Sequence, residues 1–214
     1  MSVRSVVKGV GHYLPERVVE NSEFEKSLDT TDEWIKSRSG IERRHLAADG
    51  QTTSEMATAA AQAALIDAGL VASDLDAIIV ATSTADLTFP SAATMVQHAL
   101  GMTKGYAFDV QADWTDRGTC VLFGDGAGAL LLEVAEGDGS NADRGILSTD
   151  LNSDGSQRDI LYVDGGVSTQ STGHLRMQGK EVFRHAVEKL AQTAETALEK
   201  AGLSGDDVDW IVPH

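Results

Sequence analysis

Residues 75–110 read LDAIIVATSTADLTFPSAATMVQHALGMTKGYAFDV, and this stretch decides the fold class. The apolar runs LDAIIVATST and YAFDV predict two strands. Between them, Ser91 is a favoured N-cap for the helix AATMVQHAL, and Gly101 is suited to end it. A strand, a helix and a second strand in this order predict a parallel pair with a helical crossover. The chain is therefore predicted to have an α/β fold.

The flanking sequence extends this pattern in both directions. On the N-terminal side, the valine-rich SVRSVVKGVGHYLP predicts a strand, and SEMATAAAQAALIDAGL predicts a helix that Thr52 and Thr53 begin and Gly69 ends. On the C-terminal side, GILSTDL predicts a strand, and apolar residues every three or four positions predict an amphipathic helix over 177–201. The final VDWIVPH predicts a buried strand.

Composition excludes several classes of protein. The 214 residues carry a formal charge of −16, which disfavours nonspecific attraction to nucleic acid or to an anionic membrane. No apolar run approaches the roughly 20 residues that span a bilayer, so we expect a cytoplasmic protein. The single cysteine, Cys120, cannot form an internal disulfide, and no Cys/His cluster has metal-ligand spacing, so no metal site is predicted.

The alternation of strands and helices stops after Val110. Gln111 and Ala112 run directly into DWTDRGT, and CVLFGDGAGALLLEV then predicts two apolar strands separated by glycines. Neighbouring parallel strands need a connection of a dozen or more residues, usually with a helix, and none is present here. We therefore predict that an internal segment is missing between Ala112 and Asp113; a genuine short turn is the alternative. The strand that closes on His214 likewise predicts a chain cut before its sheet is complete.

Four stretches, in this order, carry a resemblance to a known family: GVGHYLPERVVEN, TTDEWIKSRSGIERRHLA, DWTDRGTCVLFGDGAGALLLE and DWIVPH. Together they resemble beta-ketoacyl-acyl carrier protein synthase III, and the resemblance covers essentially the whole chain. It implies a thiolase-like αβαβα layered fold, incomplete as given. Residues 1–142 would form the N-terminal half and residues 143–214 the start of the C-terminal half. The family is homodimeric, with the active site between the halves.

The resemblance also implies an activity. Family members transfer an acyl group, commonly acetyl, from coenzyme A to a cysteine, condense it with malonyl-acyl carrier protein and release carbon dioxide. Coenzyme A thioester is a substrate, and no cofactor is implied. The family nucleophile begins a helix directly after the strand that matches AFDV, so it would fall in the missing segment. Cys120 stands where the family has an aliphatic residue and is interpreted as an inert, buried side chain.

His214 is the one catalytic residue of the family motif that the chain retains. In the family, VPH opens the motif whose histidine acts in catalysis, and a neutral imidazole can donate a hydrogen bond to a developing enolate. Its partner asparagine would lie beyond the end of this sequence. The five other histidines are interpreted as surface or packing residues: His12, His45, His98, His174 and His185.

Ligand contacts follow from the same motifs. By resemblance, Trp34 and Arg117 enclose the adenine of coenzyme A, with Thr30, Arg38 and Gly118 nearby. The basic cluster that includes Arg38 would form a phosphate-binding rim, although a solvated surface is the plain reading: Lys36, Arg38, Arg43, Arg44 and His45. Five residues match the pantetheine tunnel or acyl pocket, or belong to an ordinary core: Phe89, Leu122, Phe123, Met177 and Phe183.

Lys180 and Arg184 are four residues apart on the helix predicted over 177–201 and so share a face. The resemblance makes this pair a docking site for the acidic carrier protein; helix-surface solubility is the alternative. Two other functions stay open for the chain as a whole. One is a related synthase that uses another acyl donor, and the other is a scaffold that has lost its cysteine helix. The primer chain length is not encoded in the residues present.

Overall fold

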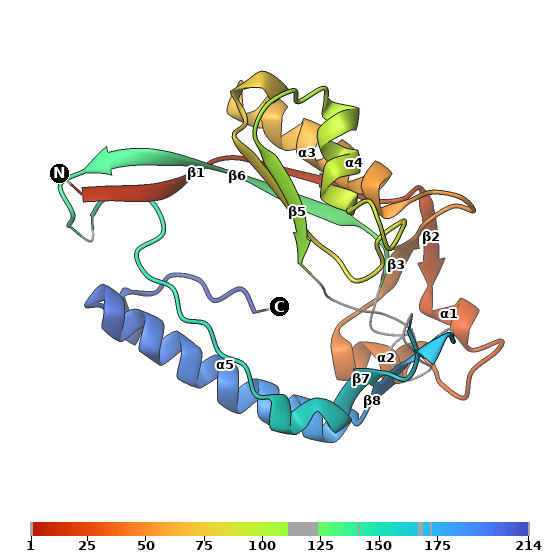
Figure 1. Ribbon diagram of the computed structural model, residues 1–214. Coiled ribbons are helices and arrows are strands. Elements are labelled where there is room, and N and C mark those ends of the chain that lie inside the picture. Colours follow the sequence, from red (N-terminus) through yellow and green to blue (C-terminus); the bar gives the residue numbers. More distant parts are fainter. Residues whose placement is uncertain (1, 111–123, 141, 167–168, 172, 214) are drawn as a thin grey trace. The chain divides into compact units, whose positions relative to one another are not determined.

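The computed structural model describes residues 2–110, 124–140, 142–166, 169–171 and 173–213 (Figure 1). Contacts divide the chain into two compact units. One combines residues 1–7, 132–162 and 176–214, and the other combines residues 8–131 and 163–175. Both units are assembled from separate stretches of sequence. The predicted division into residues 1–142 and 143–214 stays a prediction.

The centre of the unit built on residues 8–131 is a parallel strand pair. Strands β4 (Ala77–Ala81) and β5 (Tyr106–Val110) pair in parallel over all five residues of each. Helix α4 (Ala92–Leu100) connects them and packs on both strands (Figure 1). The predicted strand–helix–strand unit is confirmed, because a parallel pair needs such a crossover.

The helix ends follow the capping residues in the sequence. Helix α3 (Thr53–Ala68) packs on α4 and begins with a capping box, in which the side chains of Thr52 and Glu55 each accept a hydrogen bond from the other's backbone N–H. Gly69 ends α3 with a φ of 67°, and Gly101 ends α4 with a φ of 75°, both in the left-handed region. The predicted starts and ends of both helices are confirmed.

Glycines bring strand β1 (Ser2–Tyr13) against α3. A Cβ atom at Gly9 would meet the backbone of Ala64 and Ala68, and one at Gly11 would meet the backbone of Ala60 and Ala64. The strand and the helix can therefore approach this closely only where β1 lacks side chains. Strand β1 also pairs with β6 (Ala127–Gly137). This confirms the second of the two strands predicted in CVLFGDGAGALLLEV, whereas the first, CVLF, lies outside the described residues.

A second small layer holds the residues of the TTDEW motif. Strands β2 (Arg17–Glu20) and β3 (Arg43–Leu46) pair antiparallel over four residues. Between them the chain forms α1 (Asn21–Phe24) and α2 (Asp32–Ser39). The hairpin thus fixes both ends of the segment that contains α2. A short 3-10 turn, η1 (Ala72–Asp74), links α3 to β4.

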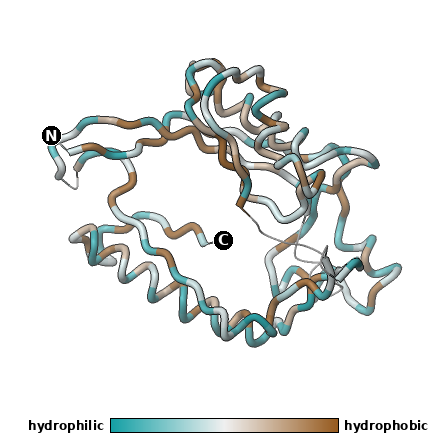
Figure 2. The backbone as a smooth tube through the Cα atoms, in the orientation of Figure 1, coloured by the Kyte–Doolittle hydropathy of each residue, from teal (hydrophilic) through white to brown (hydrophobic). Residues whose placement is uncertain are grey.

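Helix α5 (Gly179–Ala201) dominates the other unit and confirms the helix predicted over 177–201, although it begins two residues later. Gly202 ends it in the left-handed region. The Lys200 ammonium lies 2.6 Å from the Asp150 carboxylate, and the Ser148 hydroxyl donates to the Ala197 carbonyl at 2.6 Å. Along helix α5, apolar residues alternate with polar ones (Figure 2). Among the described residues, short elements lie just before and after α5 in the sequence: η2 (Gly155–Ile160), β7 (Leu161–Val163), β8 (Leu175–Met177) and η4 (Gly205–Asp207).

Two predicted strands are wrong. Residues 145–151, GILSTDL, contain no strand, although Ile146 donates one backbone hydrogen bond to the Ser5 carbonyl at 2.9 Å. Residues 208–213 contain no strand either, and Trp210, Ile211 and Val212 are 86%, 78% and 90% exposed. An apolar run becomes a buried strand only where a partner strand and a covering layer meet it. Among the helices described, none is long and apolar enough to cross a bilayer.

The close approach of β1 to α3 makes Gly11 a sensitive position. Replacing Gly11 with Ala should lower the free energy of unfolding by about 2–3 kcal/mol, because the methyl group must displace helix backbone. Gly128→Ala is the matched control, since a Cβ there meets nothing within 4 Å. Urea unfolding of both variants measures the difference. Equal stabilities would contradict the packing described for β1.

Candidate functional site

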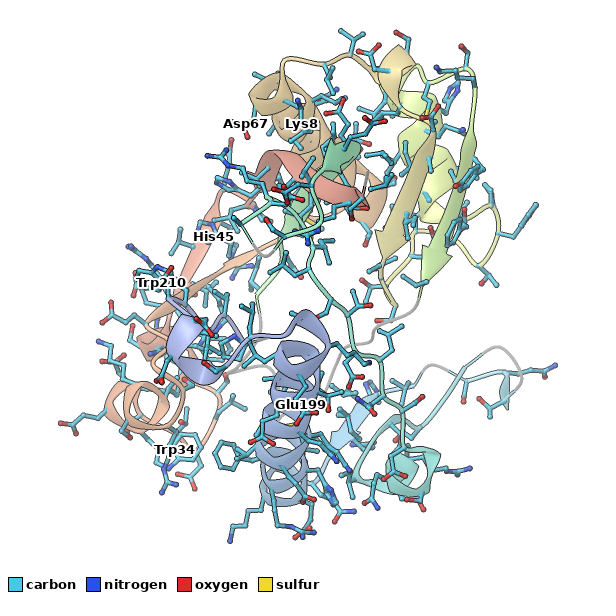
Figure 3. The ribbon with its side chains drawn as sticks, turned by 90° about the vertical axis from the view of Figure 1, so that its left-hand side faces the viewer. Lys8, Trp34, His45, Asp67, Glu199 and Trp210 are labelled. Carbon is cyan, nitrogen blue, oxygen red and sulfur yellow. The ribbon has the colours of Figure 1, made fainter. Side chains whose placement is uncertain are left out.

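Helix α2 presents an aromatic side chain at the surface. The Thr31 side chain caps the helix by accepting a hydrogen bond from the Trp34 backbone N–H at 3.1 Å, and Gly40 ends the helix at a φ of 72°. Ile35 is 1% exposed and holds α2 onto its unit, whereas the neighbouring Trp34 is 51% exposed. Figure 3 shows the Trp34 side chain on the outer side of α2. The helix therefore offers an exposed indole side chain to a ligand.

A guanidinium group accompanies this ring. The Cζ atom of Arg38, one turn further along α2, lies 5.9 Å from the centroid of the Trp34 ring, within cation–π range. Arg38 itself is exposed. A planar aromatic surface beside a planar cation suits a ligand that combines a flat heterocycle with negative charge.

The rest of the basic cluster is not uniformly solvated. Arg44 is only 4% exposed and stacks over the Phe24 ring at 4.6 Å, so it lies beneath the surface. Lys36 is exposed but pairs with the Asp32 carboxylate at 3.0 Å. His45 directs Nδ1 to the Pro15 carbonyl at 2.5 Å. Arg38 and the exposed Arg43 therefore remain as the surface guanidinium groups of the cluster.

Thr30 precedes the α2 cap and is half-buried. Its hydroxyl oxygen is buried and has no hydrogen-bond partner among the residues that the structure describes. Buried hydroxyl groups are usually hydrogen-bonded. The predicted site residues Thr30, Trp34 and Arg38 lie together on and just before α2, as their spacing in the sequence requires.

The carboxyl ends of β4 and β5 form a second feature. The Asp109 carboxylate accepts hydrogen bonds from the backbone N–H groups of Ala92 and Ala93, both at 2.7 Å, and so ties β5 to the first turn of α4. The Thr82 N–H donates to the Val110 carbonyl at 2.7 Å, which continues the parallel pairing to the end of the strand. In open α/β sheets, ligand sites lie outside the carboxyl ends of strands.

Phe89 lies on the loop between β4 and α4 and is 88% exposed. The loop is fastened to the start of α3: the Ser54 N–H and hydroxyl both donate to the Asp86 carboxylate, and the Thr53 hydroxyl donates to the Thr84 carbonyl at 2.6 Å. A large apolar side chain is thereby held in solvent on an anchored loop. The predicted role of Phe89 in an acyl pocket stays a prediction.

The start of α5 carries two exposed cations. Arg184 pairs with Glu181 at 2.6 Å, and this hydrogen bond lowers the pKa of the Glu181 carboxyl. Lys180 is exposed, and Phe183, between the two cations, is 72% exposed. Met177, at the end of β8, is half-buried. The cations thus share their helix face with acidic neighbours.

Several predicted site residues lie outside the described residues: Arg117, Gly118, Leu122, Phe123 and His214. Cys120 and the predicted junction between Ala112 and Asp113 also lie outside them. Within the described part of the chain, no group of three or more His, Cys, Asp or Glu side chains could hold a metal ion.

Sequence reasoning missed three anchoring residues. Asn21 is 1% exposed and hydrogen-bonds to Asp32 and to Arg44. Asp109 fixes strand β5 to the start of α4, and Asp86 fixes the loop after β4 to the start of α3. Asp109 is the one signal that could have been found, because a carboxylate in the otherwise apolar YAFDV needs a specific partner. Nothing in the sequence near Asn21 distinguishes it from an ordinary surface residue.

Relatives of known sequence identify the family. The sequence model of the family 3-oxoacyl-[acyl-carrier-protein] synthase III matches residues 91–155. The beta-ketoacyl-[acyl-carrier-protein] synthase III of Ruegeria pomeroyi is 68% identical in an alignment that covers 100% of this chain and 77% of the relative. The chain belongs to the synthase III family. Its class, an acyltransferase of fatty acid biosynthesis, is thereby confirmed as predicted.

Solved structures agree with this assignment. The synthase III of Aquifex aeolicus is 36% identical, and its match has a TM-score of 0.84 over 95% of this chain and 74% of that one. The priming beta-ketosynthase of the R1128 polyketide pathway is 30% identical, with a TM-score of 0.83 over 96% of this chain and 72% of that one. The predicted thiolase-like α/β fold is confirmed.

The synthase III relatives are longer in the aligned region. The alignment with the Ruegeria pomeroyi protein spans 250 positions, whereas this chain has 214 residues. The difference leaves 36 positions at which the relative has a residue and this chain has none.

Proposed function

We propose that this protein, in the full form of its family, condenses an acyl-CoA primer, acetyl-CoA first, with malonyl-acyl carrier protein. The product is a 3-oxoacyl-acyl carrier protein, and the step begins fatty acid synthesis. The 68% identity to a synthase III carries the proposal. We further propose that the protein acts in the cytoplasm as a homodimer, as the family resemblance implies.

The reaction proceeds in two half-reactions. A cysteine thiolate attacks the thioester carbon of acetyl-CoA, and the thiolate of coenzyme A leaves. Malonyl-acyl carrier protein then loses carbon dioxide by cleavage of its carbon–carbon bond, and the resulting enolate attacks the acyl-enzyme thioester. The cysteine thiolate leaves in turn. His214 is the proposed donor that stabilises the enolate oxygen.

The proposed position of the nucleophile follows from strand β5. The family cysteine comes directly after the strand that matches AFDV, at a helix start, where backbone N–H groups favour a thiolate. In this chain that strand ends at Val110, at the carboxyl edge of the parallel pair. The alignment leaves 36 positions of the relative unmatched, and we propose that they form one absent segment that begins after Ala112 and contains the cysteine. The chain of 214 residues should then form no acyl-enzyme.

Restoring the segment tests this proposal. The 36 unmatched residues of the Ruegeria pomeroyi relative are inserted between Ala112 and Asp113, and the residues that follow the match to His214 in the relative are appended. The restored chain and the chain of 214 residues are each incubated with acetyl-CoA. Mass spectrometry of the intact proteins should show one added acetyl group on the restored chain and none on the chain of 214 residues. Replacing the inserted cysteine with Ala should abolish the addition, whereas Cys120→Ala in the restored chain should preserve it. Acylation of the 214-residue chain, or acylation that depends on Cys120, would refute the proposal.

Trp34 and Arg38 are the proposed contacts for the nucleotide end of coenzyme A, together with Thr30, Arg117 and Gly118. The support is the exposed indole ring with a guanidinium group 5.9 Å from its centroid. Because the chain has a net charge of −16, a polyanion needs such a local cation to bind. Phe89, Leu122, Phe123, Met177 and Phe183 remain proposed contacts of the pantetheine arm or acyl group.

Arg38→Ala should weaken coenzyme A binding roughly tenfold, because it removes a charge-assisted contact to phosphate. The salt dependence of the dissociation constant should fall as well. Calorimetric titration at two ionic strengths measures both effects. Arg17→Ala, which removes another exposed arginine of the same unit, serves as the control and should change neither. Unchanged affinity in the Arg38 variant would exclude this role.

Lys180 and Arg184 are the proposed docking residues for the acidic carrier protein. Reversing both charges to Glu in the restored chain should raise the KM for malonyl-acyl carrier protein several-fold, since steering between opposite charges is lost. The rate of acylation by acetyl-CoA should not change. Lys189→Glu is the control, because nine residues from Lys180 place it on the opposite side of α5. Equal effects on both substrates would refute the docking role.

A priming ketosynthase of a polyketide pathway is the second candidate, because one such enzyme matches this chain at 30% identity. Competition between acetyl-CoA and longer acyl-CoA primers for the restored chain separates the two functions. A preference for acetyl-CoA favours fatty acid synthesis.

A further inference from the structure

A buried chain of hydrogen bonds lies behind helix α2. Arg44, on β3, donates from Nη2 to the Asn21 side-chain oxygen at 2.9 Å. The Asn21 amide nitrogen donates to the Asp32 carboxylate at 2.8 Å and to the Ile41 carbonyl at 2.8 Å. Asn21 and Arg44 are 1% and 4% exposed. Because polar groups removed from water depend on their partners, this geometry is strongly determined.

The Asn21 amide contacts both ends of α2. Asp32 is the first residue of the helix, and Ile41 follows Gly40, the residue that ends it. One side chain therefore holds the start and the finish of an eight-residue helix at once. Ile35, 1% exposed, fills the space beneath the middle of the helix. Together these contacts set both the position of α2 and its rotation about its own axis.

The electrostatics of Asp32 strengthen this attachment. The hydrogen bond from Asn21, followed by the contact with Lys36, lowers the pKa of the Asp32 carboxyl. A carboxylate in the first helical turn also interacts favourably with the helix dipole. The Asp32 N–H donates in addition to the Glu25 carboxylate at 2.7 Å. The start of α2 is thus held as an anion against a buried donor.

Rotation of α2 decides where Trp34 and Arg38 point. Both residues lie on the same short helix as Asp32 and Ile35, and both are exposed at its surface. We propose that Asn21 and Arg44 are positioning residues, which orient the Trp34–Arg38 pair toward the nucleotide end of coenzyme A. This inference rests on the proposed function, which assigns that ligand to the pair.

The test compares Asn21→Ala with Gln51→Ala in the chain of 214 residues. Gln51 is the control, because its half-buried side-chain amide likewise bridges two groups of the same unit, the Tyr13 hydroxyl and the Ala48 N–H. Asn21→Ala should weaken binding of coenzyme A roughly tenfold in calorimetric titration, the loss expected for hydrogen bonds that include a charged group. Affinity for 4′-phosphopantetheine, which lacks the nucleotide, should stay unchanged. Gln51→Ala should leave both affinities unchanged.

Hydrogen exchange supplies a readout that does not depend on the ligand. In Asn21→Ala, the backbone amides of α2 should exchange faster, while those of α3 keep their rates. If Asn21→Ala does not fold, Asp32→Ala removes the same hydrogen bond at a half-exposed position and should show the same pattern.

The outcomes separate this inference from the proposed function. If Arg38→Ala weakens coenzyme A binding and Asn21→Ala does not, the positioning role is overturned and the binding site stands. If Asn21→Ala weakens the binding of coenzyme A and of 4′-phosphopantetheine equally, Asn21 acts only on overall folding and the inference fails. If neither Arg38→Ala nor Asn21→Ala changes the affinity, the proposed binding site is itself wrong.

Discussion

The parallel pairing of β4 and β5 is the constraint on which the rest of the account depends. A parallel pair needs a crossover, and α4 supplies it, with its first turn held by the Asp109 carboxylate. Pairing continues to the last residue of β5, where the Thr82 N–H bonds to the Val110 carbonyl. The chain therefore leaves Val110 at the edge of the sheet where α/β proteins place their reactive groups. A nucleophile that follows β5 directly would be well placed there.

Helix α2 illustrates how binding residues depend on buried neighbours. Trp34 and Arg38 are surface residues, and nothing in their own side chains fixes their direction. Asn21 and Arg44 lie beneath the helix and connect it to the β2–β3 hairpin. Arg44 thus stabilises the structure, while the exposed Arg38 and Arg43 remain available to a ligand. Charge clusters in a sequence can mix these two roles.

Local signals in the sequence predicted much of the fold. Features that depend on contacts between distant residues were not predicted. Thr52, Ser91, Gly69 and Gly101 mark helix ends because caps act within one turn. Residues 145–151 and 208–213 are apolar enough for strands but pair with no strand in the described part of the chain, and pairing cannot be read from a single segment. For the candidate site, motif resemblance indicated Trp34 and Arg38, whereas the burial of Asn21 and Arg44 depends on contacts distant in sequence.

The central claim is that the acyl-carrying cysteine belongs directly after β5, in a segment absent from the 214 residues. Sequencing the source gene tests it most directly. The account predicts about 36 additional codons between those for Ala112 and Asp113, the number of unmatched positions in the alignment with the Ruegeria pomeroyi relative, with a cysteine codon at or near the start of that insertion. Adjacent codons for Ala112 and Asp113 would contradict the claim and leave a synthase III relative without its nucleophile.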